Sequence, residues 1–155
     1  MDIGLFYYSN TGNTRNVAEK LDKKLTEKGH NVTMAEITIT GDTPAQQGKF
    51  KLKNIPHPDN YDAIIFGAPV QAFSLNPVMI AYLEQLPPLD GKKAAVFVTK
   101  KLPLLMAGGT GSIAIMRKAC EMKGAKVVTS EIVVWAEKKR KESIRKCVES
   151  ITKIF

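Results

Sequence analysis

Residues 3–14 read IGLFYYSNTGNT, a short apolar run that leads directly into six small residues, five of them polar. Apolar residues then recur at helical spacing through Val17, Ala18, Leu21 and Leu25, so the six residues lie between a strand and a helix. In open α/β sheets, ligands bind outside the carboxyl ends of the strands, where such a loop lies. The stretch therefore predicts an α/β fold with an anion site after its first strand.

The chemistry of this loop suits a phosphate monoester. A helix N-terminus offers unpaired N–H donors and about half a positive charge, and Gly12 lets the backbone approach an oxyanion closely. The alternative is ordinary helix capping, for which one polar residue is enough. The loop lacks the lysine of phosphoryl-transfer loops, and Arg15 is expected to point outward along the helix. We predict a phosphate that is held rather than transferred, by Ser9, Asn10, Thr11, Gly12, Asn13 and Thr14.

The rest of the chain continues the alternation of strand and helix. Further strands are predicted at 31–37, 61–67, 94–99 and 127–135, and helices at 13–28, 77–86, 113–123 and 137–154. Residues 38–60 are predicted as a long loop that could contain a short helix near Pro44–Gln47. Three of the strands are apolar almost throughout, as in a parallel sheet covered on both faces. We predict one domain, residues 1–155, with five parallel strands between two layers of helices.

The composition is that of a soluble globular protein. Hydrophobic residues make up 44% of the chain and charged residues 25%. No apolar run approaches the roughly 20 residues that span a bilayer, and the N-terminus has no signal-peptide pattern, so we expect a cytoplasmic protein without a membrane partner. Cys120 and Cys147 lie in helical stretches and are expected to be buried thiols. No cysteine or histidine has metal-ligand spacing.

The net charge of +8 is unevenly distributed. Residues 1–77 hold eight basic and eight acidic side chains, whereas residues 78–155 hold 15 basic and seven acidic ones. Such asymmetry indicates either an anionic partner or one solvated helix face. Nucleic acid is the less favoured partner, because the basic residues lack interleaved aromatic side chains and no nucleic-acid motif accompanies them.

The segment YYSNTGNT resembles the phosphate-binding loop of the flavodoxins and related FMN proteins, and the likeness in length and element order extends over the whole chain. The resemblance implies a doubly wound three-layer sandwich with strand order 2-1-3-4-5 and FMN at its switch point. It also implies that two loops flank the flavin ring. In the first, Phe73 either stacks on the ring or packs into the core, and in the second the lysines face either the ring or solvent. The implied ring-flanking residues are Ala68, Pro69, Val70, Gln71, Ala72 and Phe73, and Thr99, Lys100, Lys101, Leu102, Gly108 and Gly109.

The sequence departs from electron-carrying flavodoxins in three respects. It is basic where they are acidic, and Leu102 and Leu104 stand where they usually have an aromatic residue. The segment Val70–Asn76 contains no glycine, although a turn near the flavin N5 needs positive φ, which other residues resist.

Three functions remain open at this point. The first is an electron carrier, a monomer or weak dimer, whose redox protein partners are expected to be acidic. The second is an NAD(P)H-dependent FMN or quinone reductase with two-electron flavin chemistry. The third is a flavodoxin-like binding domain that has lost its cofactor.

Overall fold

The computed structural model describes residues 1–41, 49–102 and 108–155. Its centre is a parallel sheet in the order β2-β1-β5-β7-β8, which confirms the predicted order. The chain runs outward from β1 to one edge and then crosses back to build the other half, so a switch point lies between β1 and β5. The strands are β1 (Asp2–Tyr7), β2 (Asn31–Glu36), β5 (Ala63–Gln71), β7 (Lys93–Lys100) and β8 (Lys126–Val134).

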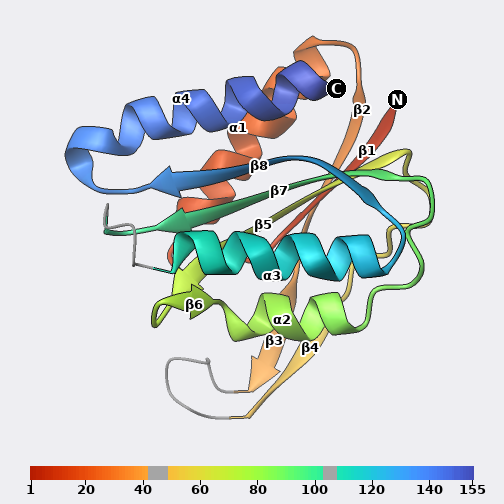
Figure 1. Cartoon of the computed structure of the whole chain (residues 1–155), viewed down its shortest axis with the longest axis horizontal. Coiled ribbons are helices and arrows are strands. Elements are labelled where there is room, and N and C mark those ends of the chain that lie inside the picture. Colours follow the sequence, from red (N-terminus) through yellow and green to blue (C-terminus); the bar gives the residue numbers. More distant parts are fainter. Residues whose placement is uncertain (42–48, 103–107) are drawn as a thin grey trace.

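In the described residues, four helices cover the two faces of the sheet. Helices α1 (Asn13–Glu27) and α4 (Glu137–Ile154) lie on one face, and α2 (Pro77–Glu84) and α3 (Gly109–Met122) lie on the other (Figure 1). All four helices begin near the carboxyl ends of the strands, at the left of Figure 1. The predicted three-layer α/β architecture is therefore confirmed.

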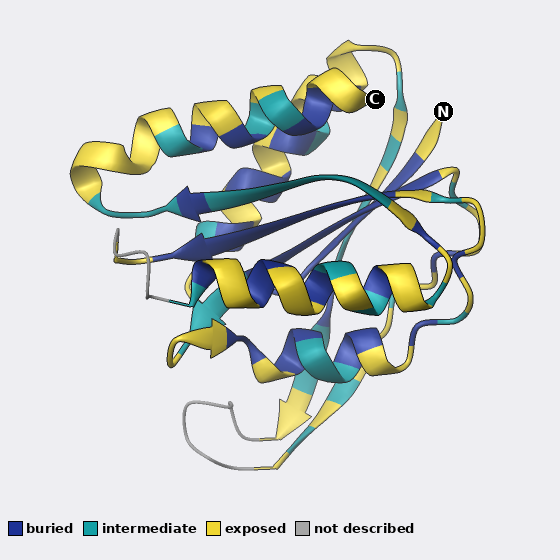
Figure 2. Ribbon diagram, in the orientation of Figure 1, coloured by how far each residue is buried: buried dark blue, intermediate teal, exposed yellow. Residues whose placement is uncertain are grey.

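The core consists of two apolar clusters, one on each side of the sheet. Phe6, Phe66 and Val96 point toward α2 and α3, whereas Leu5 and Phe97 belong to the cluster beneath α1 and α4. The central strands are buried along nearly their whole length (Figure 2), because alternate side chains enter opposite cores.

The two cysteines are buried on opposite faces of the sheet. Cys120 of α3 belongs to one core cluster and Cys147 of α4 to the other, and both are free thiols. The prediction of two buried helical thiols is confirmed.

The prediction of a long loop at 38–60 is wrong in part. Strands β3 (Thr38–Gly41) and β4 (Phe50–Asn54) form an antiparallel pair beside the main sheet. Phe50 and Leu52 alternate with exposed lysines and pack against the core, so the period-two pattern of a half-buried strand was present in the sequence. The possible helix near Pro44–Gln47 lies outside the described residues.

The structure also corrects two shorter segments. Helix α3 begins at Gly109, four residues before the predicted start, because its first turn has no apolar periodicity to reveal it. Strand β6 (Ser74–Leu75) was not predicted and pairs with the end of β5. None of the helices in the described parts of the chain combines the length and apolar character needed to cross a membrane.

Candidate functional site: a cleft at the carboxyl edge of the sheet

A cleft of about 250 Å³ opens at the carboxyl edge of the sheet. Three segments that are distant in sequence line it: the loop before α1, the end of β5 with its turn, and the end of β7. All of the lining residues are among the predicted site residues: Asn10, Thr11, Asn13, Thr14, Pro69, Val70, Gln71, Ala72, Thr99, Lys100 and Lys101. The fold therefore brings together the three predicted segments, while their binding of a cofactor stays a prediction.

In the loop before α1, one residue caps the helix and other residues line the cleft. The Ser9 hydroxyl oxygen accepts hydrogen bonds from the backbone N–H groups of Gly12 and Arg15, each at 3.2 Å. Gly12 is the N-cap residue with φ of 93°, a conformation that favours glycine. One side chain thus performs the capping, and the neighbouring residues Asn10, Thr11 and Asn13 line the cleft.

Thr14 joins two walls of the cleft. Its Oγ1 lies 2.9 Å from Oγ1 of Thr99, and both residues are buried. One hydroxyl donates to the other, which fixes the first turn of α1 against the end of β7. Thr14 also lines the cleft, so this contact leaves the cavity open.

Arg15 points away from the loop, as predicted. Its guanidinium donates two hydrogen bonds of 2.7 Å to the carboxylate of Glu36 at the end of β2. The arginine charge is therefore paired at the neighbouring strand. An anion at the loop would be held by backbone and neutral side-chain donors, aided by the helix dipole.

The second wall is a continuation of β5 and not a free loop. Ala68 is buried in the core, and the strand extends through Gln71 before it turns into β6. The two turn residues, Ala72 and Phe73, both have positive φ, at 48° and 62°. We expected non-glycine residues to resist this conformation here. The pairing of Gln71 with Ser74 imposes it, because a two-residue hairpin turn matches strand twist best with positive φ at both positions.

Phe73 does not pack into the core. Its side chain is 69% exposed and lies outside the residues that line the cleft. Its carbonyl faces Gly108, the N-cap of α3, where a Cβ would lie only 2.2 Å from the Phe73 oxygen. The two segments predicted to flank the ring therefore touch each other at Gly108.

The third wall is the end of β7. Lys100 is 8% exposed, lines the cleft and lies beneath the start of α3, where its Cδ would be 3.3 Å from a Cβ at Gly109. Lys101 also lines the cleft but is exposed, and Leu102 is 51% exposed outside it. The sequence left open whether these lysines face the cleft, and the structure places both in its lining. Leu104 lies outside the described residues.

Sequence reasoning missed Asn76, which supports the second wall. Asn76 is fully buried, accepts a hydrogen bond from the Val78 N–H at 2.8 Å as the N-cap of α2, and donates one of 2.6 Å to the Gln71 side chain. It thereby orients a residue of the cleft. The signal was an asparagine directly before the proline that opens a helix.

The described residues that line the cleft suit the binding of an anion. Among the lining residues that the structure describes there are two lysines and no aspartate, glutamate, histidine, cysteine or tyrosine. Burial raises the pKa of the nearby Tyr8, so its phenol stays protonated at neutral pH. Within the described ranges, no group of three acidic, histidine or cysteine side chains is placed to hold a metal ion.

Comparison with known proteins agrees with this fold. A family model described as a flavodoxin domain matches residues 5–127. No curated protein sequence matches the chain significantly. A Streptococcus pneumoniae TIGR4 flavodoxin aligns over 100% of both chains with 19% identity and a TM-score of 0.70.

Two further solved structures show the same likeness. Oxidised Flavodoxin 2 from Bacillus cereus has 20% identity over 100% of both chains and a TM-score of 0.69. Two-electron reduced flavodoxin from Megasphaera elsdenii has 19% identity over 97% of this chain and 98% of its own, also with a TM-score of 0.69. At this level of identity the structural matches establish a shared fold.

Proposed function

This chain belongs to the flavodoxin family, and on that basis we propose that it binds FMN in the cleft and acts as an electron-transfer protein. One observation carries the proposal. The N-terminus of α1, the end of β5 and the end of β7 converge on a single cleft at the switch point of the sheet, which is where doubly wound folds bind nucleotides.

The chain's own groups suit both ends of FMN. The phosphate would lie at the N-terminus of α1, near the backbone N–H groups and the side chains of Thr11 and Asn13. The ring would lie between Pro69–Ala72 and Thr99–Lys101, which line different parts of the same cleft. Bound flavin supplies the electron-transfer chemistry, while the protein positions it and tunes its potential.

Binding of FMN and of riboflavin, which lacks the phosphate, tests the role of the α1 loop. Two charge-assisted hydrogen bonds to phosphate contribute about 3 kcal/mol or more, so we expect FMN to bind about 100-fold more tightly than riboflavin. Flavin fluorescence quenching measures both dissociation constants. Equal affinities would contradict a phosphate site at α1.

A pair of variants locates the phosphate more closely. Asn13→Ala removes a cleft side chain and should weaken FMN binding several-fold, while riboflavin binding stays unchanged. Asn16→Ala is the matched control, because Asn16 lies one turn further along α1 and outside the cleft lining. If both variants weaken FMN binding equally, the loop does not hold the phosphate as proposed.

The lysines favour one alternative, an NAD(P)H-dependent FMN or quinone reductase. Two cations, with no carboxylate among the described lining residues, would stabilise an anionic, fully reduced flavin, which suits two-electron chemistry. Stopped-flow mixing of the FMN-loaded protein with NADH and with NADPH separates the two functions. We expect little bleaching of the flavin on the turnover timescale, whereas rapid bleaching would favour the reductase.

A further inference from the structure

The first turn of α4 concentrates positive charge. Lys138, Lys139, Arg140 and Lys141 follow Glu137, all five residues are exposed, and together they carry a net charge of +3. This is the densest run of basic residues in the sequence and accounts for much of the charge surplus of the second half.

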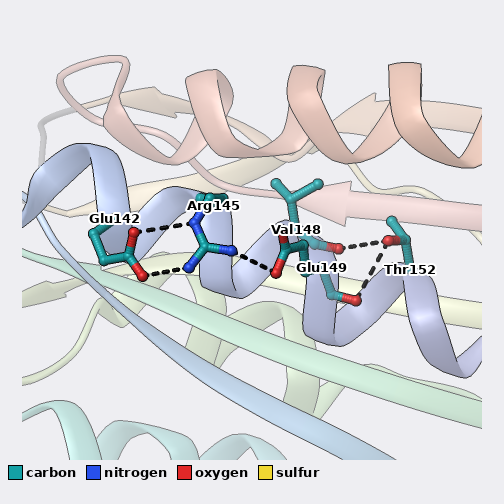
Figure 3. Close-up of polar contacts among 5 residues, drawn as sticks. All are labelled: Glu142, Arg145, Val148, Glu149 and Thr152. Atoms are coloured by element: carbon teal, nitrogen blue, oxygen red, sulfur yellow. Dashed lines mark hydrogen bonds and ion pairs between the residues drawn. The ribbon is translucent and has the colours of Figure 1, made fainter.

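Elsewhere in the described helices, the three other arginines are paired with carboxylates. Arg145, one turn further along α4, donates to Glu142 and to Glu149 (Figure 3). Arg15 pairs with Glu36 and Arg117 with Glu121. In the part of the chain that the structure describes, no such ion pair involves the four basic residues of the first turn of α4. Their charges therefore face solvent without an ion-pair partner among the described residues, and Glu137 of the same turn offsets one of them.

The basic residues lie where their positive charge destabilises the helix. A helix N-terminus carries a partial positive charge and favours acidic residues, yet four cations lie there, and Ala136 provides no side-chain cap. A local arrangement that lowers helix stability is typical of functional surfaces.

The same surface adjoins the cleft. The Trp135 N–H donates a 2.7 Å hydrogen bond to the Lys100 carbonyl, and Lys100 and Lys101 line the cleft. Arg140 then lies over the Trp135 ring at 5.0 Å and donates to the Trp135 carbonyl. The strand ends and the start of α4 share one edge of the molecule (Figure 1), so positive charge extends from the cleft lining to the first turn of α4.

We propose that this basic surface, formed by Lys101, Lys138, Lys139, Arg140 and Lys141, docks an acidic redox protein beside the cleft. The inference rests on the proposed electron-transfer function. Charge complementarity gives the sign of the charge on the partner's surface. Opposite charges around a redox centre steer the two proteins together and set their relative orientation. A protein fits better than nucleic acid or lipid because the charge lies where bound flavin would exchange electrons.

Binding to a matched pair of probes tests the docking surface. Native cytochrome c is basic, and its succinylated form carries the same haem on an acidic surface. At low ionic strength we expect the purified chain to bind the succinylated form at least about tenfold more tightly than the native form, with affinity falling as salt is added. Because this measurement does not require bound flavin, failure of FMN binding would not obscure it.

Two charge-reversal variants locate the surface. The variant with Lys138→Glu, Lys139→Glu and Lys141→Glu should bind succinylated cytochrome c at least about tenfold more weakly. The control with Lys93→Glu, Lys118→Glu and Lys126→Glu changes the total charge equally, away from the carboxyl edge, and should weaken binding less than about threefold. Equal losses in the two variants would overturn the proposal, because net charge alone would then explain the binding.

Electron transfer provides the second measurement. In the FMN-loaded, reduced protein, the α4 variant should reduce succinylated cytochrome c at least about tenfold more slowly, while its reduction of the uncharged acceptor benzoquinone stays unchanged. Equal slowing with both acceptors would overturn the docking role. Tighter binding of an RNA hairpin or of phosphatidylserine vesicles than of succinylated cytochrome c would also overturn it, in favour of a nucleic-acid or lipid surface.

Discussion

Gly108 joins the two segments that flank the cleft, and its replacement should be costly. It has φ of 85°, and an added Cβ would lie 2.2 Å from the Phe73 backbone oxygen. The left-handed conformation costs about 1–2 kcal/mol for a residue with a Cβ, and the overlap forces the turn or α3 to move. We expect Gly108→Ala to lower the free energy of unfolding by about 2–4 kcal/mol, measured by urea denaturation.

Gly111 is the matched control, because it lies three residues further along, inside α3. A Cβ there would meet no atom within 4 Å. Gly111→Ala should leave stability unchanged or raise it by up to about 1 kcal/mol through better helix propensity. If the two alanine variants have similar free energies of unfolding, the close approach of Gly108 to Phe73 does not constrain this part of the structure.

Lys100 should set the redox potential of bound flavin. It is 8% exposed and lines the cleft, and a cation about 5 Å from a reduced anionic ring stabilises it by about 1–3 kcal/mol. Lys100→Met should therefore lower the one-electron midpoint potential by about 40–140 mV, read by spectroelectrochemical titration. Lys93→Met, at the opposite end of the same strand, should leave the potential unchanged. An equal shift in both variants would mean that the net charge of the protein, and not the position of Lys100, sets the potential.

At the scale of one element, the β5–β6 turn places two non-glycine residues in the left-handed region. Asn-Gly is the preferred pair for such turns, so Ala72→Asn combined with Phe73→Gly should raise the free energy of unfolding by about 1–2 kcal/mol. The same double variant should weaken FMN binding if Phe73 contacts the ring. The single variant Phe73→Gly leaves the cleft residue Ala72 unchanged, so full FMN affinity in that variant would contradict a role for the Phe73 side chain. Urea denaturation and fluorescence titration measure the two effects.

The β5–β6 turn also has a conformation that could not be predicted from the sequence. The main strands could be predicted because their burial on both faces of the sheet makes them apolar throughout. The α1 loop could be predicted because its small polar residues lie directly between the first apolar run and the first helical pattern. The positive φ of Ala72 and Phe73 could not be predicted, because the pairing of β5 with β6 imposes it against the local preference of these residues. The start of α3 at Gly109 was equally hidden, because tertiary contacts and not apolar spacing fix its first turn.

At the scale of the whole molecule, the two cysteines report whether both layers of helices unfold together. Burial raises the pKa of Cys120 to about 12 and raises the pKa of Cys147 well above that of a free thiol. The thiolate is the reactive form, so at pH 8 neither thiol should react with a disulfide reagent in the native state. Labelling then requires opening, and its rate follows the population of the opened state.

Because a single sheet separates the two thiols and both helices pack on it, we expect cooperative opening. Cys120 and Cys147 should label at the same rate, and Gly108→Ala should accelerate both by the same factor, equal to its loss of equilibrium stability. Mass spectrometry of tryptic peptides separates the two sites. Faster labelling of Cys147 alone would show that α4 detaches independently, and the basic surface at its first turn would then belong to a mobile helix and not to a rigid docking face.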